Sequence, residues 1–252
     1  NSCSVHAGLK KIRGRKVELI LKDIEKSFEN KMVLKGASFA FEKGKIYGLL
    51  GRNGAGKTTL FNCISGEIEN ESGQVTLQNS TNDESRLDYS NIGYVFADPV
   101  LPEFLTGYEF IKFYIDINKN KIKDLKTIEE YLDIIKIAKE DSHRLIKGYS
   151  HGMKNKIQML CFLISRPPVI LLDEPLSSFD VIVALEIKNL LKEIKSDHII
   201  IFSTHILQLA TDLCDEIVVL NNGILEQVPS DILRSGEFEE RIMEILREES
   251  ND

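Results

Sequence analysis

The sequence predicts an α/β fold whose core is a sheet of buried parallel strands. Three short apolar runs in the second half of the chain, residues 169–172, 199–202 and 217–220, have the length and composition of fully buried strands. Segments of helical character separate these runs, as parallel strands require. A further apolar run, residues 45–50, leads into a glycine-rich loop and then a helix, and this order is typical of a phosphate-binding site.

The glycine-rich loop has the sequence Gly-Arg-Asn-Gly-Ala-Gly-Lys-Thr-Thr at residues 51–59. It matches G-x-x-x-x-G-K-[ST], in which backbone N–H groups surround nucleotide phosphates and a helix N-terminus adds partial positive charge. Lys57 is expected to reach the β- and γ-phosphates, and the Thr58 hydroxyl to ligate Mg²⁺. The alternative is a glycine-rich turn without a ligand. The predicted nucleotide-binding residues here are Arg52, Asn53, Gly54, Ala55, Gly56, Lys57, Thr58 and Thr59.

The first third of the chain is predicted to be mainly β structure. Apolar positions alternate in residues 17–21, which indicates a strand, and residues 33–41 indicate a pair of strands. Residues 72–77 indicate a turn that enters a further strand. Residues 79–90 are polar and predict a loop, whereas residues 92–96 predict a short buried strand.

The middle of the chain changes character and is predicted to be helical. Residues 108–117, 128–138 and 154–164 each carry apolar side chains at helical spacing. We therefore expect a helical subdomain at about residues 100–166, inserted into a single domain that covers residues 17–233.

The two ends of the chain are expected to lie outside this domain. Residues 1–16 lack a signal-peptide pattern and are expected to be a flexible leader or a remnant of cloning. Residues 234–252 are expected to form an amphipathic helix and a tail. The apolar face of that helix is expected to pack on its own domain, with a dimer contact as the alternative; it comprises Phe238, Ile242, Ile245 and Leu246.

Composition limits the classes of partner. A formal net charge of -7 and a pI near 5.4 argue against sequence-independent binding of nucleic acid. No apolar run reaches the length of a membrane span, so any role at a membrane needs spanning helices from another chain. Cys3, Cys63, Cys161 and Cys214 show no C-x-x-C spacing, which favours reduced thiols and a cytoplasmic location.

Two carboxylates follow the predicted strand at residues 169–172. Asp173 is expected to hold a metal ion through water, as the second half of a phosphate-loop ATPase requires. Glu174 is expected to polarise the attacking water. The alternative is an acidic turn stiffened by Pro175. His205 follows another buried strand and can reach a γ-phosphate there, although spacing alone favours a structural histidine.

In this order the motifs resemble those of the ATP-binding subunits of ABC transporters, most closely the ATPases of drug, bacteriocin and antimicrobial-peptide exporters. The resemblance runs from about residue 17 to residue 233. It implies a P-loop NTPase fold with a RecA-like parallel sheet core, an antiparallel β subdomain that binds the base, and an inserted α-helical subdomain. It also implies a head-to-tail dimer that holds two ATP molecules with Mg²⁺ between its subunits.

The resemblance assigns further residues. Tyr149-Ser-His-Gly-Met aligns with the family signature Leu-Ser-Gly-Gly-Gln, so Ser150 and Gly152 are implied to contact the γ-phosphate of the other subunit's ATP. Phe28 matches the aromatic residue that stacks on adenine. Asp180 belongs to a loop that communicates across the dimer, and His205 matches the switch histidine, which reverses the interpretation from spacing.

Three residues depart from the family pattern. His151 and Met153 replace a glycine and the glutamine of the signature. Ala97 stands where the family usually has a glutamine that senses Mg²⁺ and the attacking water, which leaves metal handling and coupling open. The apolar residues 98–105, which include two prolines, either help to receive a helix of a membrane subunit or pack on their own subdomain.

The function predicted from these observations is ATP hydrolysis in a head-to-tail dimer that drives export through a transmembrane permease subunit. The dimer is either homomeric or heteromeric, and the protein is expected in the cytoplasm, held peripherally at the inner face of the cell membrane by the permease. Two alternatives stay open: a non-transport ABC ATPase acting on a soluble partner, and a weakly hydrolysing regulatory module that binds ATP.

Overall fold

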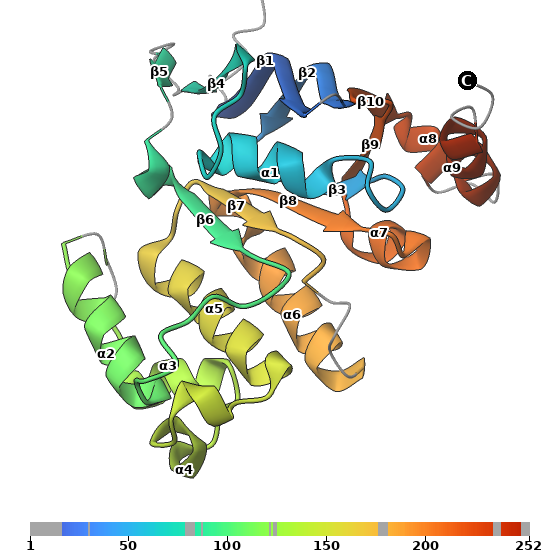
Figure 1. Cartoon of the computed structure of the whole chain (residues 1–252). Coiled ribbons are helices and arrows are strands. Elements are labelled where there is room, and N and C mark those ends of the chain that lie inside the picture. The colour runs from blue at the N-terminus through green and yellow to red at the C-terminus, as the bar shows by residue number, and fades with distance from the viewer. Residues whose placement is uncertain are drawn as a thin grey trace, which may run out of the picture.

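The structure is a computed structural model, and it describes residues 17–29, 31–78, 84–86, 88–120, 122, 125–175, 181–233 and 238–247. The predicted leader at residues 1–16 and the loop that contains Asp180 lie outside the described residues. The expected α/β fold is confirmed, with two sheets and a separate group of helices (Figure 1).

The first sheet is antiparallel, with the strand order β2-β1-β4-β5. Its strands are β1 (Glu18–Phe28), β2 (Lys31–Glu42), β4 (Ser72–Gln78) and β5 (Glu84–Arg86). The prediction of two strands within residues 33–41 was wrong, because β2 is one strand in which Gly36, at φ +91°, is skipped in the pairing with β1. This glycine bulge lets the strand bend without ending. Strand β5 lies within the predicted loop and pairs with β4.

The second sheet has six strands in the order β10-β9-β3-β8-β7-β6. They are β3 (Ile46–Leu50), β6 (Ile92–Val95), β7 (Val169–Leu172), β8 (Ile199–Thr204), β9 (Glu216–Asn221) and β10 (Ile224–Val228). All neighbours pair in parallel except β9 and β10, which form a hairpin. This hairpin was not foreseen; Asn222 and Gly223, both at positive φ, make its two-residue turn.

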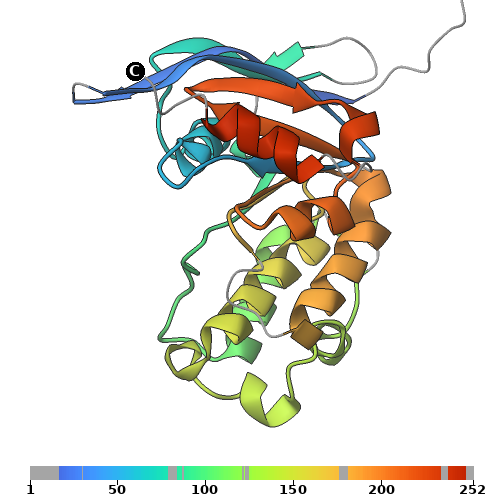
Figure 2. The same cartoon turned by 90° about the vertical axis from the view of Figure 1, so that its right-hand side faces the viewer.

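The two faces of the parallel sheet have different covers. Helix α1 (Lys57–Ser65) and the antiparallel sheet share one apolar core with the first face. Helices α5 (His151–Ser165), α6 (Val181–Ile194) and α7 (Leu207–Leu213) pack on the other face (Figures 1 and 2). The layers leave the carboxyl ends of β3, β7 and β8 side by side at one edge, where ligands of such sheets bind.

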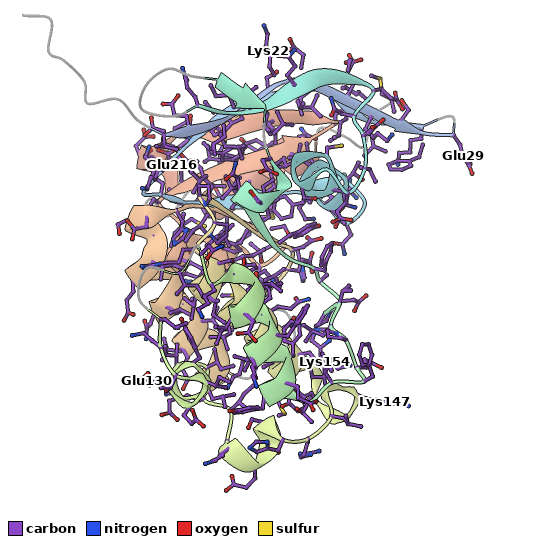
Figure 3. The ribbon with its side chains drawn as sticks, turned by 90° about the vertical axis from the view of Figure 1, so that its left-hand side faces the viewer. Lys22, Glu29, Glu130, Lys147, Lys154 and Glu216 are labelled. Carbon is purple, nitrogen blue, oxygen red and sulfur yellow. The ribbon has the colours of Figure 1, made fainter. Side chains whose placement is uncertain are left out.

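The helical segment has its own core. It consists of α2 (Gly107–Asn118), α3 (Ile128–Ile134), α4 (Lys139–Ser142) and the outer side of α5, which pack around Phe110, Ile111 and Ile146. Figure 3 shows this segment at one end of the molecule, with Glu130, Lys147 and Lys154, and the antiparallel sheet at the other, with Lys22 and Glu29. Helix α3 ends earlier than predicted, because Lys136 takes the left-handed conformation at φ +51°.

The chain's last described helices pack beside β9. Helices α8 (Ser230–Leu233) and α9 (Phe238–Arg247) bury Phe238 and Ile242 against the domain, so the predicted own-domain packing is confirmed for these residues. The side chain of Leu246 lies outside the description. Three 3-10 turns, Tyr89–Asn91, Ile146–Gly148 and Lys195–Asp197, complete the described elements. None of the helices described here is both long and apolar enough to cross a membrane.

Candidate active site

The glycine-rich loop joins β3 to α1 as predicted. Gly56 caps α1 at φ +102°, and a Cβ atom there would lie 2.6 Å from Cγ1 of Val33, so only glycine fits without displacement. No side chain caps α1, and its first turn contains no acidic residue. The first N–H groups of the helix therefore have the arrangement that attracts a phosphate.

Lys57 lies folded back over the loop. Its Nζ donates to the carbonyl oxygens of Gly51, at 2.8 Å, and Arg52, at 3.2 Å. The side chain is almost fully buried. Burial lowers its pKa, while the nearby carboxylates of Glu174 and Asp173 act in the opposite direction. This lysine is therefore a buried cation beside two carboxylates, and its three N–H donors can turn to an anion that enters the loop.

Thr58 and Asp173 meet beneath the loop. The Thr58 hydroxyl donates to Oδ2 of Asp173 at 2.6 Å, and the Ser203 hydroxyl donates to Oδ1 at 2.5 Å. Asp173 is only 3% exposed. Hard oxygen ligands of this kind suit Mg²⁺, which usually binds one or two protein groups and completes its shell with water and phosphate oxygens. The donor set fits that ion, because Thr58 and Asp173 bring one hydroxyl and one carboxylate oxygen together at 2.6 Å.

Glu174 has a strained backbone at the end of β7. It takes φ +46° and precedes Pro175, a combination that costs free energy and needs support from its surroundings. The support comes from Ser203, whose Oγ accepts a hydrogen bond from the Glu174 N–H at 2.9 Å. Oε2 of Glu174 lies 3.2 Å from Nδ1 of His205. The carboxylate and the imidazole therefore form a pair at the carboxyl edge of the sheet.

A cavity of about 340 Å³ lies between the phosphate loop and the two carboxylates, Asp173 and Glu174. Ala97, at the end of β6, contributes only a methyl group to it, where the family pattern has an amide. A neighbouring cavity of about 280 Å³ lies between the loop and His205. The residues that line the larger cavity are Val33, Asn53, Gly54, Gly56, Lys57, Thr58, Thr59, Ala97, Asp173 and Glu174.

Other predicted residues lie elsewhere. Phe28, at the end of β1, is half exposed and lines neither cavity; Nζ of Lys26 stands 5.6 Å from its ring centroid. Ser150 caps α5 in the helical segment, where its Oγ accepts from the Met153 N–H at 3.2 Å, and Gly152 follows it. One chain therefore does not bring Phe28, Ser150 or Gly152 to the cavities. Asp180 is not among the described residues.

Ser203 is the functional residue that sequence reasoning missed. It is fully buried at the end of β8 and bonds to both Asp173 and Glu174. The sequence did contain a signal for it. Ser203 directly follows the apolar residues 199–202, so its hydroxyl is expected to be buried and to need a hydrogen-bond partner.

Comparisons with known proteins agree with this geometry. Residues 34–177 match the family described as ABC transporter. The chain is 32% identical over 206 residues to YxlF of Bacillus subtilis, an uncharacterized ABC transporter ATP-binding protein. The aligned region covers 81% of this chain and 68% of YxlF. It is 31% identical over 210 residues to MJ1023 of Methanocaldococcus jannaschii, also an uncharacterized ABC transporter ATP-binding protein. This aligned region covers 82% of this chain and 76% of MJ1023.

Solved structures give the same result. One described as the ATP binding subunit of an ABC transporter superposes with a TM-score of 0.74 at 25% identity, over 90% of this chain and 98% of that one. Another, cbiO1 from Clostridium perfringens, gives a TM-score of 0.69 at 25% identity, over 91% and 96%. The chain therefore belongs to the ABC transporter family, among its ATP-binding, ATP-hydrolysing proteins.

Proposed function

We propose that this chain is the ATPase subunit of an exporter whose membrane-spanning helices belong to a separate permease, and that it works as a head-to-tail dimer. The observation that carries the proposal is the hydrogen-bonded set around Asp173 and Glu174, built against the phosphate loop. Such a set is arranged for phosphoryl transfer to water rather than for simple retention of a nucleotide.

ATP binds with its phosphates inside the loop. The backbone of residues 52–59 and the N-terminus of α1 surround the β- and γ-phosphates, and Lys57 exchanges its two carbonyl partners for phosphate oxygens. The buried position of Lys57 strengthens this contact, because little water screens it. Thr58 and Asp173 would hold Mg²⁺, which supplies neutralisation of phosphate charge when bound.

Hydrolysis is an in-line attack of water on the γ-phosphorus. Glu174 orients the water and accepts its proton as the new oxygen–phosphorus bond forms and the bond to the β-phosphate oxygen breaks, which releases ADP and phosphate. His205 pairs with Glu174, its Nδ1 lying 3.2 Å from Oε2, and holds the carboxylate toward the phosphate. Ser203 holds the Glu174 backbone and Asp173 in register.

The site is completed by a second copy or a sibling chain. Ser150 and Gly152 stand at the N-terminus of the 15-residue helix α5, which offers N–H donors to a γ-phosphate across a dimer interface. Phe28 is exposed and available for the base. We assign Asp180 to communication between the two sites.

The permease docks on the loop before α2. Val100 and Phe104 in this loop are 72% and 79% exposed, whereas Leu101 and Leu105 pack on the helical core. The exposed pair, Val100 and Phe104, supports a role in receiving a helix of the membrane subunit. The packed pair, Leu101 and Leu105, supports packing on the chain's own helical subdomain. An exposed apolar cluster on an ATPase subunit is the feature that a membrane partner would cover, and through it the chain would sit at the inner face of the cell membrane.

Export is proposed from the signature variant, in which His151 and Met153 replace glycine and glutamine. One relative, CysA of Synechocystis, is named a sulfate/thiosulfate import protein and is 31% identical over 84% of this chain and 60% of its own length. Transport direction in inverted vesicles containing the reconstituted pair decides, since uptake that depends on external ATP means export.

The first test of the proposal is Lys57→Ala. Loss of the buried cation should lower the ATPase rate by about 100-fold or more, because one preorganised group that stabilises transition-state charge is worth that much. Lys112→Ala, at an exposed lysine of α2, is the matched control and should hydrolyse ATP normally. Equal rates for wild type and Lys57→Ala would exclude the mechanism.

The second test is light scattering of Glu174→Gln with and without Mg-ATP. A shift from monomer to dimer with ATP would support a site shared between two copies despite His151. If the variant binds ATP and stays monomeric, self-pairing of the isolated chain is wrong. Either a sibling chain then supplies the counterpart of Ser150, or the dimer forms only with the permease present.

A second candidate function, a regulatory module that scarcely hydrolyses ATP, is favoured by Ala97 alone. Equal and near-zero rates for wild type and Glu174→Gln would support the module. A wild-type rate well above that of Glu174→Gln would support the ATPase, and Ala97→Gln should then raise the rate at limiting Mg²⁺.

A further inference from the structure

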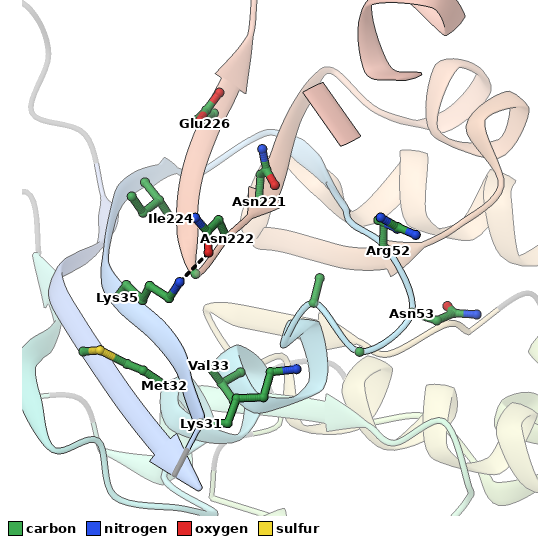
Figure 4. Close-up of a pocket in the computed structure, with 13 residues that line it drawn as sticks. Lys31, Met32, Val33, Lys35, Arg52, Asn53, Asn221, Asn222, Ile224 and Glu226 are labelled. Carbon is green, nitrogen blue, oxygen red and sulfur yellow. Dashed lines mark hydrogen bonds between the residues drawn. The ribbon is translucent and has the colours of Figure 1, made fainter. Parts of the chain in front are cut away.

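The parallel sheet has a crevice at each of two opposite edges. Figure 4 shows the crevice at the carboxyl edge, which is walled by β2, the phosphate loop and the turn between β9 and β10, where Lys35 donates to Asn222. It adjoins the phosphate loop and is part of the proposed ATP site. The second crevice, of about 400 Å³, lies at the amino edge, where the parallel strands begin, and none of its lining residues lines the ATP-site cavities.

This amino-edge crevice lies at the far ends of the strands that carry the catalytic groups. Its lining comes from the residues directly before β6, β7 and β8 and from the turn between β2 and β3. The three strands are parallel neighbours, so their first residues meet at one edge. Strands β7 and β8 then run through the core to Asp173 and to Ser203 at the opposite edge. The crevice is therefore separated from the ATP site by the length of the sheet.

Backbone hydrogen bonds tie the segments that line the amino-edge crevice to one another. The Gly44 N–H donates to the carbonyl oxygen of His198 at 2.9 Å, and the Ile199 N–H donates to that of Pro168 at 2.8 Å. Nδ1 of His198 lies 2.6 Å from the carbonyl oxygen of Pro167, and the ring is buried. The backbone around the crevice is therefore already fixed, as it is in most small-molecule sites.

Two cations at this crevice have donors to spare. Nη2 of Arg166 lies 3.8 Å from Oδ2 of Asp197, which is beyond hydrogen-bond distance. Neither Lys43 nor Arg166 donates a side-chain hydrogen bond within the part of the chain that the structure describes. Burial lowers the pKa of His198, so its imidazole is neutral at neutral pH. Asp197 is the one carboxylate in the lining, which leaves a net charge of one positive.

The remaining lining favours a ligand that is partly apolar. The rings of Pro167 and Pro168 give apolar surface beside the buried ring of His198, and the amide of Asn91 adds a polar group. The volume falls in the range of pockets that hold small molecules. A ligand that matches this lining has an apolar body and one compact anionic group.

We propose that the amino-edge crevice binds a small organic carboxylate with an apolar body, at a site separate from that of ATP. The planar guanidinium of Arg166 matches the two oxygens of a carboxylate, and Lys43 adds a second cation. One negative charge balances the net charge of the lining. A phosphate monoester carries nearly two negative charges at neutral pH, which would leave one unmatched beside Asp197.

The test uses the full chain saturated with Mg²⁺ and a non-hydrolysable ATP analogue, so that the ATP site is filled. Binding of cinnamate is measured by equilibrium dialysis, with cinnamamide as the uncharged probe of the same shape and cinnamyl phosphate as the probe with higher charge. Cinnamate should bind, and cinnamamide should bind about tenfold more weakly or not at all, because charge-assisted hydrogen bonds carry the affinity.

Variants locate the site. Lys43→Gln with Arg166→Gln should weaken cinnamate binding about tenfold. Lys112→Gln with Arg241→Gln removes the same charge from exposed positions of α2 and α9 and should bind as wild type. Asp197→Asn should bind cinnamate about two- to fivefold more tightly, because a repelling charge at the surface is removed. A merely structural role of Asp197 would not produce this gain.

Four results would overturn the proposal. They are no saturable binding of cinnamate, tighter binding of cinnamyl phosphate than of cinnamate, equal binding by the Lys43/Arg166 double variant with normal thermal unfolding, and loss of binding when the ATP analogue is present. The last result would place cinnamate in the ATP site. Binding is measured directly and without turnover, so failure here is distinguishable from failure of the hydrolysis mechanism.

Discussion

The carboxyl edge of the parallel sheet and the helical segment hold their polar groups in opposite ways. At the sheet edge, Thr58 bonds to Asp173 across 115 positions of sequence, and Ser203 bonds to Asp173 across 30. In the helical segment the helix caps are local, as in the capping box between Thr106 and Glu109, three residues apart, and the long-range bond from Lys154 to Glu103 lies at the surface. The catalytic geometry therefore depends on the whole tertiary fold, whereas each helix of the segment is largely defined by itself.

The two regions also differ in how they treat apolar side chains. The strands β3, β7 and β8 are completely buried. The helical segment leaves Val100, Phe104 and Phe113 largely exposed beside a buried core. Exposure of this kind contributes little to folding, and in our proposal it serves contact with the permease. The comparison implies that changes at the sheet edge alter chemistry, while changes on the helical surface alter partnership.

The largest expected effect separates two phenylalanines of the helical segment. Phe110→Ala should cost about 3–5 kcal/mol of unfolding free energy, because it leaves a cavity in a packed core, where Phe110 is 9% exposed. Phe104→Ala should change stability by less than about 0.5 kcal/mol, as surface substitutions do. Urea unfolding of both variants measures the difference. A large loss in Phe104→Ala would mean that this residue belongs to the fold and not to a docking surface.

A smaller effect is expected at the sheet edge from Ser203→Ala. The variant should lose about 10–100-fold in ATPase rate or in affinity for Mg²⁺, which is the usual cost of removing a group that orients a metal ligand. The shift should appear in the Mg²⁺ concentration for half-maximal rate, which a general loss of stability would not move. Ser65→Ala, which removes a buried hydroxyl from α1, is the control and should keep the wild-type Mg²⁺ dependence. An unchanged Mg²⁺ dependence in Ser203→Ala would remove Ser203 from the site.

The sequence predicts the sheet edge well because each chemical group there follows a local pattern. The motif around Lys57 and the carboxylates after residues 169–172 fix which strand ends carry chemistry. Strand order is not local, so the position of β9 beside β3, and with it the crevice at Lys35 and Asn222, could not be foreseen. The role of Ser203 was missed for the same reason, because its partners are 29 and 30 positions away.

Misplaced elements have equally specific causes. Gly36 lies within residues 33–41, where two strands were predicted, and the single strand β2 passes through it because a glycine bulge continues a strand. Lys136, at positive φ, ends the helical turn after α3, and a lysine side chain does not predict a left-handed backbone conformation. Strand β5 is short and polar, and it exists through pairing with β4 rather than through its own composition.

A third prediction uses pH to compare a buried histidine of the core with an exposed one of the helical segment. His198 is buried at the start of β8, and its Nδ1 lies 2.6 Å from the carbonyl oxygen of Pro167. Burial lowers its pKa below the ordinary value of 6.5. The unfolded chain therefore binds the proton more readily, and stability should fall as pH drops through about 6.5, by at most about 1.4 kcal/mol per pH unit.

Urea unfolding at about pH 7.5 and about pH 5.5, roughly one unit on either side of the ordinary histidine pKa, measures this effect. His198→Asn should lose less stability than wild type between these values, and His151→Asn, at an exposed position of α5, should behave as wild type. Equal pH dependence in all three proteins would show that His198 does not carry the effect.

The smallest effect tests how independent the helical segment is. Thr106→Ala removes the N-cap of α2, whose hydroxyl accepts the Glu109 N–H at 3.2 Å, and should cost about 1 kcal/mol. Thr127→Ala removes the equivalent cap of the shorter helix α3 and should cost a similar amount. Hydrogen exchange should show faster exchange within the affected helix. The ATPase rate of the isolated chain should stay at the wild-type value, because the hydrogen bonds of these two caps in the described structure stay within their own helices. A rate that fell together with the stability of α2 would contradict the comparison, since the helical segment would then be holding the sheet edge in its active geometry.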